Sequence, residues 1–253
     1  MRAFLAYPMM VLQTLIFIVP ITLMTLFRIP IDPDSFVGRG GHWWSHWVLE
    51  AAGVKVVVRN PERVSRTESR VYVSNHVSWF EIFALATIVD RYRFVAKKEI
   101  RRVPLFGRAA GAVAAIYIER GNRKAAFSAY EEAAKRIRDG LNVVVFPEGT
   151  RGRSYELRPF KKGPFVLAIA AQVPIVPVLS WGSKEVQAKG EIGIHSGTIE
   201  LTFLEPVETK GLTYEDRDAL VETVWNRIAA ALEEKGVQLH KPTVEEAAAV
   251  QAE

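Results

Sequence analysis

Cysteine is absent from this chain of 253 residues. The protein therefore has no disulfide, no thiolate metal ligand and no cysteine nucleophile, and the absence itself does not indicate a compartment. Only five histidines are present. His42 and His46 lie four residues apart, but the glutamate of a metalloprotease helix is missing, and no group of Asp, His and Glu has the spacing of a metal site. We predict no metal ion and expect any chemistry to rest on other side chains.

Charge is absent from residues 3–27. This apolar run is long enough for a membrane-spanning helix of about 20 residues, although we expect Pro8 and Pro20 to interrupt it. A signal peptide explains the run less well, because Arg28 closes it and no small-residue cleavage site follows. The run predicts association with a membrane, and the flanking charges are too few to set an orientation.

Tryptophan is concentrated shortly after this run. A helix through this segment places Trp43, Trp44 and Trp47 on one side, together with Val48 and Ala51. Because tryptophan favours the membrane interface, the segment resembles a helix that lies in the plane of the membrane. The alternative is that the tryptophans pack on the globular core. We predict that residues 1–52 form membrane-anchoring helices and that residues 53–253 form the domain that carries the chemistry.

Positive charge is in slight excess, with 33 Lys and Arg against 28 Asp and Glu and a net charge of +5. Such a balance fits a nucleic acid, an anionic membrane surface or a phosphorylated ligand. The basic residues are dispersed among acidic ones, and no nucleic-acid recognition motif is present. We therefore predict no nucleic-acid partner.

After Gly53, short β-branched runs alternate with helical patterns. The predicted strands cover residues 54–58, 71–73, 94–96, 115–118, 143–146, 175–179 and 198–203. The predicted helices cover residues 79–89, 124–139, 164–172 and 214–235. This alternation indicates an α/β fold with a largely parallel or mixed sheet flanked by helices, preceded by the membrane-associated segment. In such sheets ligands bind beyond the carboxyl ends of the strands.

A candidate site follows the predicted strand at residues 71–73. His76 and Glu81 would point about 140° apart on one continuous helix, so His76 must lie in the turn before the helix to contact Glu81. Glu81 then holds one imidazole nitrogen, and the other acts as a base toward a hydroxyl. The alternative is a capping box, in which Ser78 binds an amide of the first turn and Glu81 reaches back to the cap. Glu81 can also share the two roles.

A second candidate site begins at Phe146, at the end of another predicted strand. The turn formed by Gly149, Thr150 and Arg151 supplies backbone amides and a guanidinium suited to an anion. A base together with an anion clamp indicates transfer chemistry on a phosphorylated substrate. Pro147 and Gly149 also have a purely structural explanation, because both residue types are common in turns.

These two blocks are part of a series of four that resembles the glycerolipid acyltransferase family, particularly the lysophosphatidic acid acyltransferases. The first block is Asn75-His76 with a carboxylate at Glu81. The second comprises residues 96–99, 104–107 and 116–120, the third residues 146–151, and the fourth residues 173–178. The resemblance extends over about residues 70–180, and it rests on the order of all four blocks rather than on any one of them.

The resemblance implies transfer of a fatty acyl group from a thioester to the 2-hydroxyl of lysophosphatidic acid, which gives phosphatidic acid. The implied donor is acyl-CoA or acyl carrier protein, a co-substrate rather than a bound cofactor. The implied partners are the lysophospholipid acceptor and the membrane bilayer. The cytoplasmic face of the inner or cell membrane is expected, because such thioesters occur there.

The resemblance also assigns roles to residues. His76 would be the general base and Glu81 the carboxylate that orients it. The residues implied in substrate binding are Lys97, Arg120, Glu148, Gly149, Thr150, Arg151 and Arg153. Guanidinium groups match phosphate oxygens, which favours the arginines as phosphate ligands.

Glu81 departs from the family, which usually has aspartate at this position. Its additional methylene can shift the histidine, which supports one alternative, a noncatalytic membrane lipid-binding protein. The presence of His76 and of the whole 146–151 turn supports an enzyme. The same chemistry on another lysolipid acceptor is a further alternative. Ser78 could instead be the nucleophile of an acyl-enzyme with His76 as its base, but no nucleophile-elbow pattern surrounds it.

Overall fold

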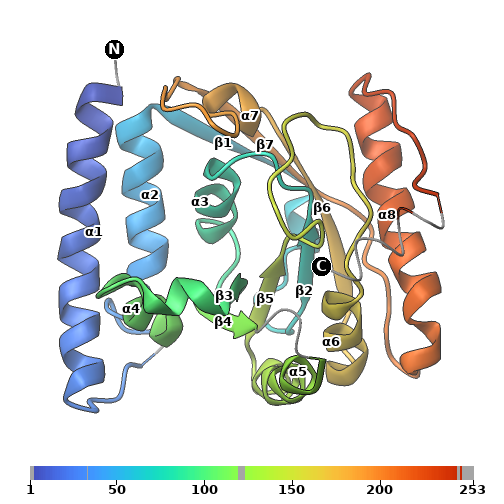
Figure 1. The fold of residues 1–253 in the computed structure, drawn as a ribbon, viewed down its shortest axis with the longest axis horizontal. Coiled ribbons are helices and arrows are strands. Elements are labelled where there is room, and N and C mark those ends of the chain that lie inside the picture. The colour runs from blue at the N-terminus through green and yellow to red at the C-terminus, as the bar shows by residue number, and fades with distance from the viewer. Residues whose placement is uncertain (1–2, 33, 119–122, 244–245, 247–253) are drawn as a thin grey trace.

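The computed structural model describes residues 3–32, 34–118, 123–243 and 246. Within these residues, one seven-stranded sheet has the order β1-β7-β6-β2-β5-β3-β4 (Figure 1). Strands β6, β2, β5, β3 and β4 are parallel, whereas β7 is antiparallel to β6 and β1 is parallel to β7. The strands are β1 (Val54–Arg59), β2 (Val71–Ser74), β3 (Tyr92–Lys97), β4 (Ala115–Ile118), β5 (Asn142–Val145), β6 (Ile175–Trp181) and β7 (Gly197–Phe203). The predicted α/β fold with a mixed sheet is confirmed.

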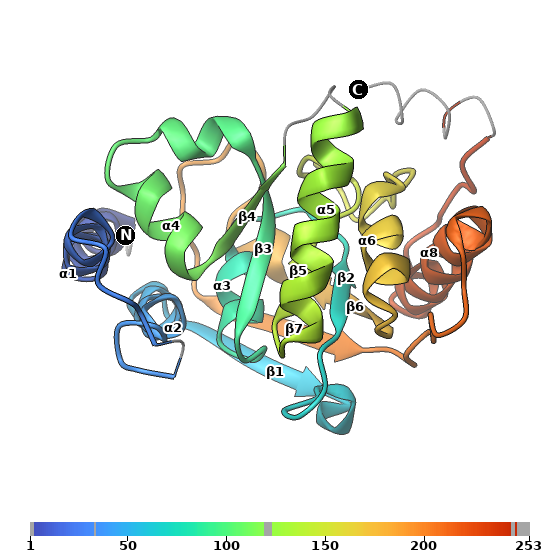
Figure 2. The ribbon, with the colours of Figure 1, turned by 90° about the horizontal axis from the view of Figure 1, so that it is seen from below.

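Helices cover both faces of the sheet (Figure 2). The α-helices are α1 (Ala3–Leu26), α2 (Gly40–Ala52), α3 (Phe80–Ala86), α4 (Phe106–Val113), α5 (Arg123–Arg138), α6 (Gly163–Ala171), α7 (Ser183–Val186) and α8 (Arg217–Glu234). Short 3-10 helices are η1 (Pro61–Arg63), η2 (Lys98–Arg102) and η3 (Tyr214–Asp216). Val71 and Val73 of β2 face a core shared with α5, α6 and α8, whereas Tyr72 faces a second core shared with α2 and α3. Burial on both faces explains why this central strand has no polar alternation.

The predicted strands and helices after residue 53 match the observed elements, with ends that differ by at most three residues. Helices α4 and α7 were not predicted. Helix α4 contains Gly107 and Gly111, which are poor helix formers, and α7 has only four residues. Both helices are short, and the glycines of α4 lower its helical propensity, so neither segment was predicted from the sequence.

The N-terminal apolar run forms one helix, α1, which continues through Pro8 and Pro20. The expectation that these prolines interrupt it is wrong. A proline inside a helix costs about 3 kcal/mol or more, and packing on either side of Pro20 offsets this cost. The Phe17 ring lies 5.2 Å from the Trp47 ring of α2, and Ile21 is buried with residues of α4.

The tryptophans of α2 pack largely on neighbouring helices. The Trp44 ring meets Phe83 of α3 edge-on at 5.2 Å, and its Nε1 donates to Thr14 Oγ1 of α1 at 3.0 Å. Trp47 packs on α1, whereas Trp43 remains exposed. Trp44 and Trp47 therefore pack on the rest of the molecule, and Trp43 is the most exposed of the three.

The parallel pairing of β2 and β5 brings the two candidate sites together. Val73 of β2 is in register with Val145 of β5. Because both strands run in the same direction, their carboxyl ends meet at one edge of the sheet. The turn that contains His76 follows β2, and the turn at residues 146–151 follows β5. The fold thus places them side by side, at the edge where open α/β sheets bind ligands.

Candidate active site

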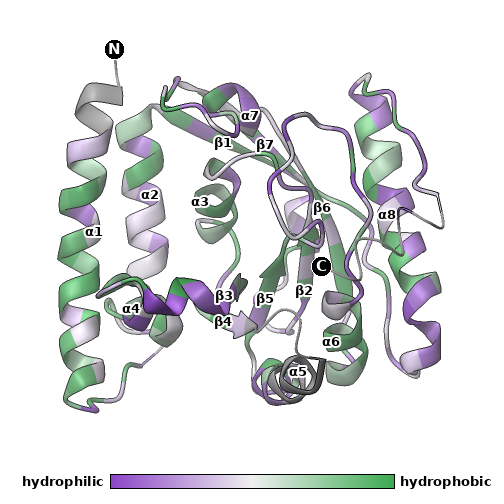
Figure 3. Ribbon diagram, in the orientation of Figure 1, coloured by the Kyte–Doolittle hydropathy of each residue, from purple (hydrophilic) through white to green (hydrophobic). Residues whose placement is uncertain are grey.

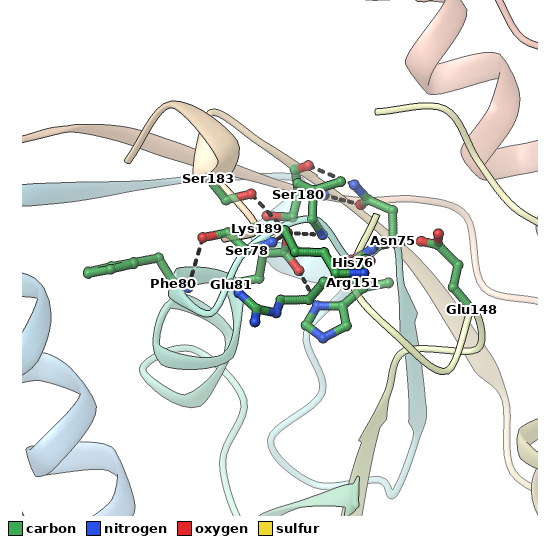
Figure 4. Close-up of polar contacts among 12 residues, drawn as sticks. Asn75, His76, Ser78, Phe80, Glu81, Glu148, Arg151, Ser180, Ser183 and Lys189 are labelled. Carbon is green, nitrogen blue, oxygen red and sulfur yellow. Dashed lines mark hydrogen bonds and ion pairs between the residues drawn. The ribbon is translucent and has the colours of Figure 1, made fainter. Parts of the chain in front are cut away.

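His76 and Glu81 form a hydrogen-bonded pair at the end of β2. The distance from His76 Nδ1 to Glu81 Oε2 is 2.8 Å (Figure 4). His76 lies in the turn before α3, as the spacing predicted, and Glu81 is in the first turn of that helix. Since Glu81 is an acceptor toward all its other partners, we assign the Nδ1 hydrogen to His76 as donor. Its Nε2 has no hydrogen bond within the described residues and is left to accept a proton.

The other oxygen of Glu81 caps the same helix. Glu81 Oε1 accepts hydrogen bonds from the backbone amides of Val77 (2.7 Å) and Ser78 (2.8 Å) and from Ser183 Oγ (2.9 Å). The Ser78 hydroxyl in turn accepts from the amide of Phe80 at 3.2 Å. Glu81 therefore combines the capping role with the contact to histidine, one role for each oxygen. The fully buried glutamate reaches both sets of donors, so its additional methylene is accommodated.

The backbone of His76 is fixed from both sides by the turn after β5. Glu148 Oε1 accepts a hydrogen bond from the His76 amide at 2.8 Å, and the amide of Gly152 donates to the His76 carbonyl at 2.6 Å. The imidazole stacks on the Phe146 ring, with 4.0 Å between ring centroids. These contacts position the imidazole through its main chain and its ring face, independently of Glu81.

The buried Glu148 forms an ion pair with Arg158, a partner that the sequence did not indicate. Its Oε2 accepts a hydrogen bond from Arg158 Nε at 3.1 Å, and Arg158 also binds the hydroxyl and the carbonyl oxygen of Thr150. Burial raises the pKa of Glu148 to about 7, although the Arg158 guanidinium and the His76 amide both lower it. Arg158 follows the third block by seven residues, and nothing in its sequence context distinguishes it from a surface arginine.

Asn75 fastens the end of β2 to β6. Its Oδ1 accepts from the amide of Ser180 at 2.8 Å, and its Nδ2 donates to the carbonyl of the same residue at 3.0 Å. Asn75 is buried, so water cannot replace these two bonds. The asparagine of the first block therefore has a positioning role, which its place beside His76 in the sequence did not define.

Arg151 lies at the same edge of the sheet as the histidine (Figure 4). Its guanidinium lies over the exposed Trp79 ring, 4.6 Å from the ring centroid. Partial burial lowers the pKa of Arg151, and the Glu81 carboxylate opposes this effect. Thr150 is exposed, and Gly149 has a φ of +78°, a left-handed conformation that glycine adopts without strain. The turn thus presents a half-buried cation close to His76.

The described part of the structure does not connect the remaining predicted ligands to the His76 and Glu81 pair. Lys97 ends β3 and Arg153 follows the Arg151 turn; both side chains are exposed, and no hydrogen bond joins either to the dyad within the described residues. Arg120 lies outside the described residues, as does Glu119 of the same block. Among the predicted residues, the structure brings together His76, Glu81, Glu148 and the turn at residues 149–151.

Ser78 is occupied by structural contacts. It is buried, and its hydroxyl donates to the carbonyl of Gln187 at 2.7 Å while it accepts from a helix amide. His76 directs its Nδ1 to Glu81 rather than to this hydroxyl. This geometry favours direct use of the histidine as a base over an acyl-enzyme on Ser78.

Comparison with known proteins agrees with this geometry. The chain is 35% identical to human 1-acyl-sn-glycerol-3-phosphate acyltransferase beta over 173 residues, which are 68% of this chain and 62% of that protein. It is 33% identical to an uncharacterised acyltransferase of Schizosaccharomyces pombe over 192 residues, covering 71% of this chain and 67% of that protein. The chain thus spans about three fifths of the length of the human relative.

A solved structure shares the fold. The 1-acyl-sn-glycerophosphate acyltransferase PlsC of Thermotoga maritima superposes with a TM-score of 0.73 at 24% identity, covering 94% of this chain and 98% of that one. The family described as Acyltransferase matches residues 55–181, which contain the dyad, the Arg151 turn, strands β2 to β6 and all of β1 except Val54. Since this match covers half of the sequence and the relatives are about a third identical to the chain over the aligned residues, the chain belongs to the acyltransferase family.

Proposed function

We propose that the protein transfers a fatty acyl group from an acyl thioester to the 2-hydroxyl of lysophosphatidic acid, giving phosphatidic acid for phospholipid synthesis. The observation that carries the proposal is the His76 and Glu81 pair, with the free imidazole nitrogen at the carboxyl end of the sheet and Arg151 beside it. The similarity to 1-acyl-sn-glycerol-3-phosphate acyltransferases supports the same acceptor. The donor is acyl-CoA or acyl carrier protein.

The geometry supports a direct transfer. His76 Nε2 takes the proton of the acceptor hydroxyl as its oxygen attacks the thioester carbonyl, and Glu81 stabilises the resulting imidazolium. The tetrahedral intermediate then collapses, the carbon–sulfur bond breaks, and the imidazolium returns its proton to the leaving thiolate. The products are the ester and the free thiol, and the histidine returns to its neutral form. A positioned base of this kind typically contributes about 10²- to 10⁴-fold to the rate.

Arg151 is the best-placed phosphate ligand for the acceptor. Its guanidinium is half-buried near the dyad, and guanidinium groups bind phosphate oxygens through paired hydrogen bonds. We assign Lys97, Arg120 and Arg153 as further ligands and Gly149 and Thr150 as part of the binding turn. Glu148 acts on the acceptor site through Arg158 and the His76 backbone.

We further propose that residues 1–52 anchor the protein to a membrane and that residues 53–253 form the acyltransferase domain. Helix α1 is long and apolar enough to cross a membrane over Tyr7–Leu26, and it is mostly hydrophobic along its length (Figure 3). However, Tyr7 and Thr22 both hydrogen-bond to residues of the domain. Contacts at two points so far apart along the helix keep α1 beside the domain, which supports attachment to one leaflet rather than a span. We assign this leaflet to the cytoplasmic face because acyl thioesters occur there.

The test is release of coenzyme A from a long-chain acyl-CoA by detergent-purified protein with lysophosphatidic acid, compared with the His76→Ala variant. We expect turnover that the variant loses. Turnover only with another lysolipid would change the acceptor and keep the chemistry, and turnover only with acyl carrier protein would identify the donor. Folded protein that is inactive with both donors and all acceptors would support the noncatalytic lipid-binding alternative.

A further inference from the structure

The segment between α7 and β7, residues 187–193, contacts the N-terminal helix. The hydroxyl of Tyr7 in α1 donates to the carbonyl of Ile192 at 2.7 Å and accepts from Gln187 Nε2 at 3.0 Å. Gln187 is buried, so its amide is held in place rather than exchanging freely with water. One tyrosine hydroxyl thus connects both ends of this segment to α1.

The same segment contacts both turns of the candidate active site. The carbonyl of Gln187 accepts the hydrogen bond from Ser78 Oγ, and Ser78 belongs to the turn whose amides bind Glu81. Lys189 Nζ donates to the carbonyl oxygen of Arg151 at 2.8 Å (Figure 4). Residues 187–193 therefore link α1 to the base and to the proposed phosphate ligand.

Ile192 is the most exposed large hydrophobic side chain of the described residues, at 80%. Its neighbour α1 also exposes apolar side chains, and those more than 40% exposed in this helix are Met9, Val11, Leu12, Leu15, Ile16, Leu23 and Leu26. An isolated exposed isoleucine on a soluble surface needs no explanation, but this one is held by Tyr7 against a helix of membrane-spanning hydropathy.

We propose that residues 187–193 form a second bilayer contact, in which Ile192 inserts at the lipid interface next to α1 while Gln187 and Lys189 hold the two active-site turns. The inference rests on the proposed membrane anchoring of α1. The contact fixes the distance of His76 and Arg151 from the lipid surface, where a lysolipid acceptor presents its headgroup. Tyr7, Gln187 and Lys189 are positioning residues, because they act through Ser78 and Arg151.

The absence of cysteine allows a direct test of insertion. The Ile192→Cys variant carries one thiol for an environment-sensitive fluorophore, and Tyr214→Cys is the matched control. Tyr214 is also exposed, and it precedes α8, across the molecule from α1 (Figure 1). With vesicles of phosphatidylethanolamine and phosphatidylglycerol, we expect a blue shift at position 192 and quenching by doxyl-labelled lipid, with neither change at position 214.

The outcomes separate this inference from the proposed function. Protein that sediments with vesicles while the label at position 192 stays aqueous would overturn the second contact and leave the anchor intact. Protein that fails to bind vesicles would overturn both. The fluorescence readout requires no turnover, so an error in the assigned reaction does not affect it.

The coupling to the site is tested by Tyr7→Phe, which removes one hydroxyl and keeps the ring. We expect kcat/KM for acceptor in vesicles to fall about fivefold or more, because both hydrogen bonds of the Tyr7 hydroxyl, to Ile192 and from Gln187, are lost. Vesicle binding should stay unchanged, and the protein should remain folded at the assay temperature, which the thermal unfolding midpoint checks. Tyr214→Phe, whose hydroxyl has no hydrogen bond within the described residues, should behave like the parent protein. Unchanged kcat/KM in Tyr7→Phe would contradict the coupling.

Discussion

Replacement of Glu81 by glutamine gives the sharpest test of the dyad, because the side chain keeps its size and loses one acceptor. Three donors face Oε1, and only His76 Nδ1 faces Oε2. If the amide NH₂ of glutamine faced the three donors, those buried groups would lose their acceptor, at about 1–3 kcal/mol each. The glutamine oxygen must therefore take the Oε1 position, and its NH₂ faces the imidazole.

This orientation changes the tautomer of His76. Facing an NH₂ donor, Nδ1 must accept, so the imidazole hydrogen moves to Nε2, the atom that has to take the substrate proton. In serine proteases the corresponding aspartate-to-asparagine change keeps the geometry and lowers kcat about 10⁴-fold. We expect Glu81→Gln to lower kcat by about 10³- to 10⁴-fold, equivalent to about 4–5 kcal/mol in the activation free energy.

The assay is coenzyme A release under saturating acceptor, with the thermal unfolding midpoint as a check of folding. Glu185→Gln is the control, because it makes the same chemical change in an exposed carboxylate that binds Tyr155. The double variant of Glu81→Gln with His76→Ala should be no slower than His76→Ala alone, since the two residues act as one unit. Folded Glu81→Gln protein with more than about a tenth of the parent activity would refute the tautomer argument.

Three further predictions concern neighbouring residues. Burial raises the pKa of Glu148 from 4.5 to about 7, so the folded state binds this proton more tightly than the unfolded state. The free energy of unfolding should therefore fall by up to about 3 kcal/mol between pH 4.5 and pH 7, and denaturant titrations should show this part of the pH dependence disappear in Glu148→Gln. Asn75→Ala should lower the free energy of unfolding by about 1–3 kcal/mol, because it leaves the buried Ser180 amide and carbonyl without their partner; an unchanged denaturation midpoint would contradict this. Arg151→Ala should raise KM for lysophosphatidic acid about tenfold or more with little change in kcat, whereas an unaltered KM would remove Arg151 from the phosphate site.

The sheet and the dyad were predictable because both depend on local sequence. The β-branched runs of β2 and β5 indicate where each strand begins and ends and that it is buried. The helices between the strands indicate that the strands pair in parallel. His76 and Glu81 are separated by one turn, so their contact required only that the helix begin after the histidine.

The residues that hold the site in position were not predictable, because they come from distant parts of the chain. Arg158, Ser183 and Gln187 reach the site from loops and a short helix, and each is an ordinary polar residue in its sequence context. The prediction that prolines interrupt α1 failed for the same reason. Residues of α2 and α4 pack on this helix, and the local sequence around the prolines does not contain them.

The backbone of His76 joins two sequence blocks into one structural part. Its N–H is bound by Glu148 and its carbonyl by Gly152, so the third block determines where the base of the first block stands. We therefore expect these two blocks to function only as a matched pair in recombinants between family members, although His76 and Glu148 are 72 residues apart. A chimera that exchanges only the first or only the third block should misplace the histidine, whereas a chimera that exchanges both blocks should keep it in position.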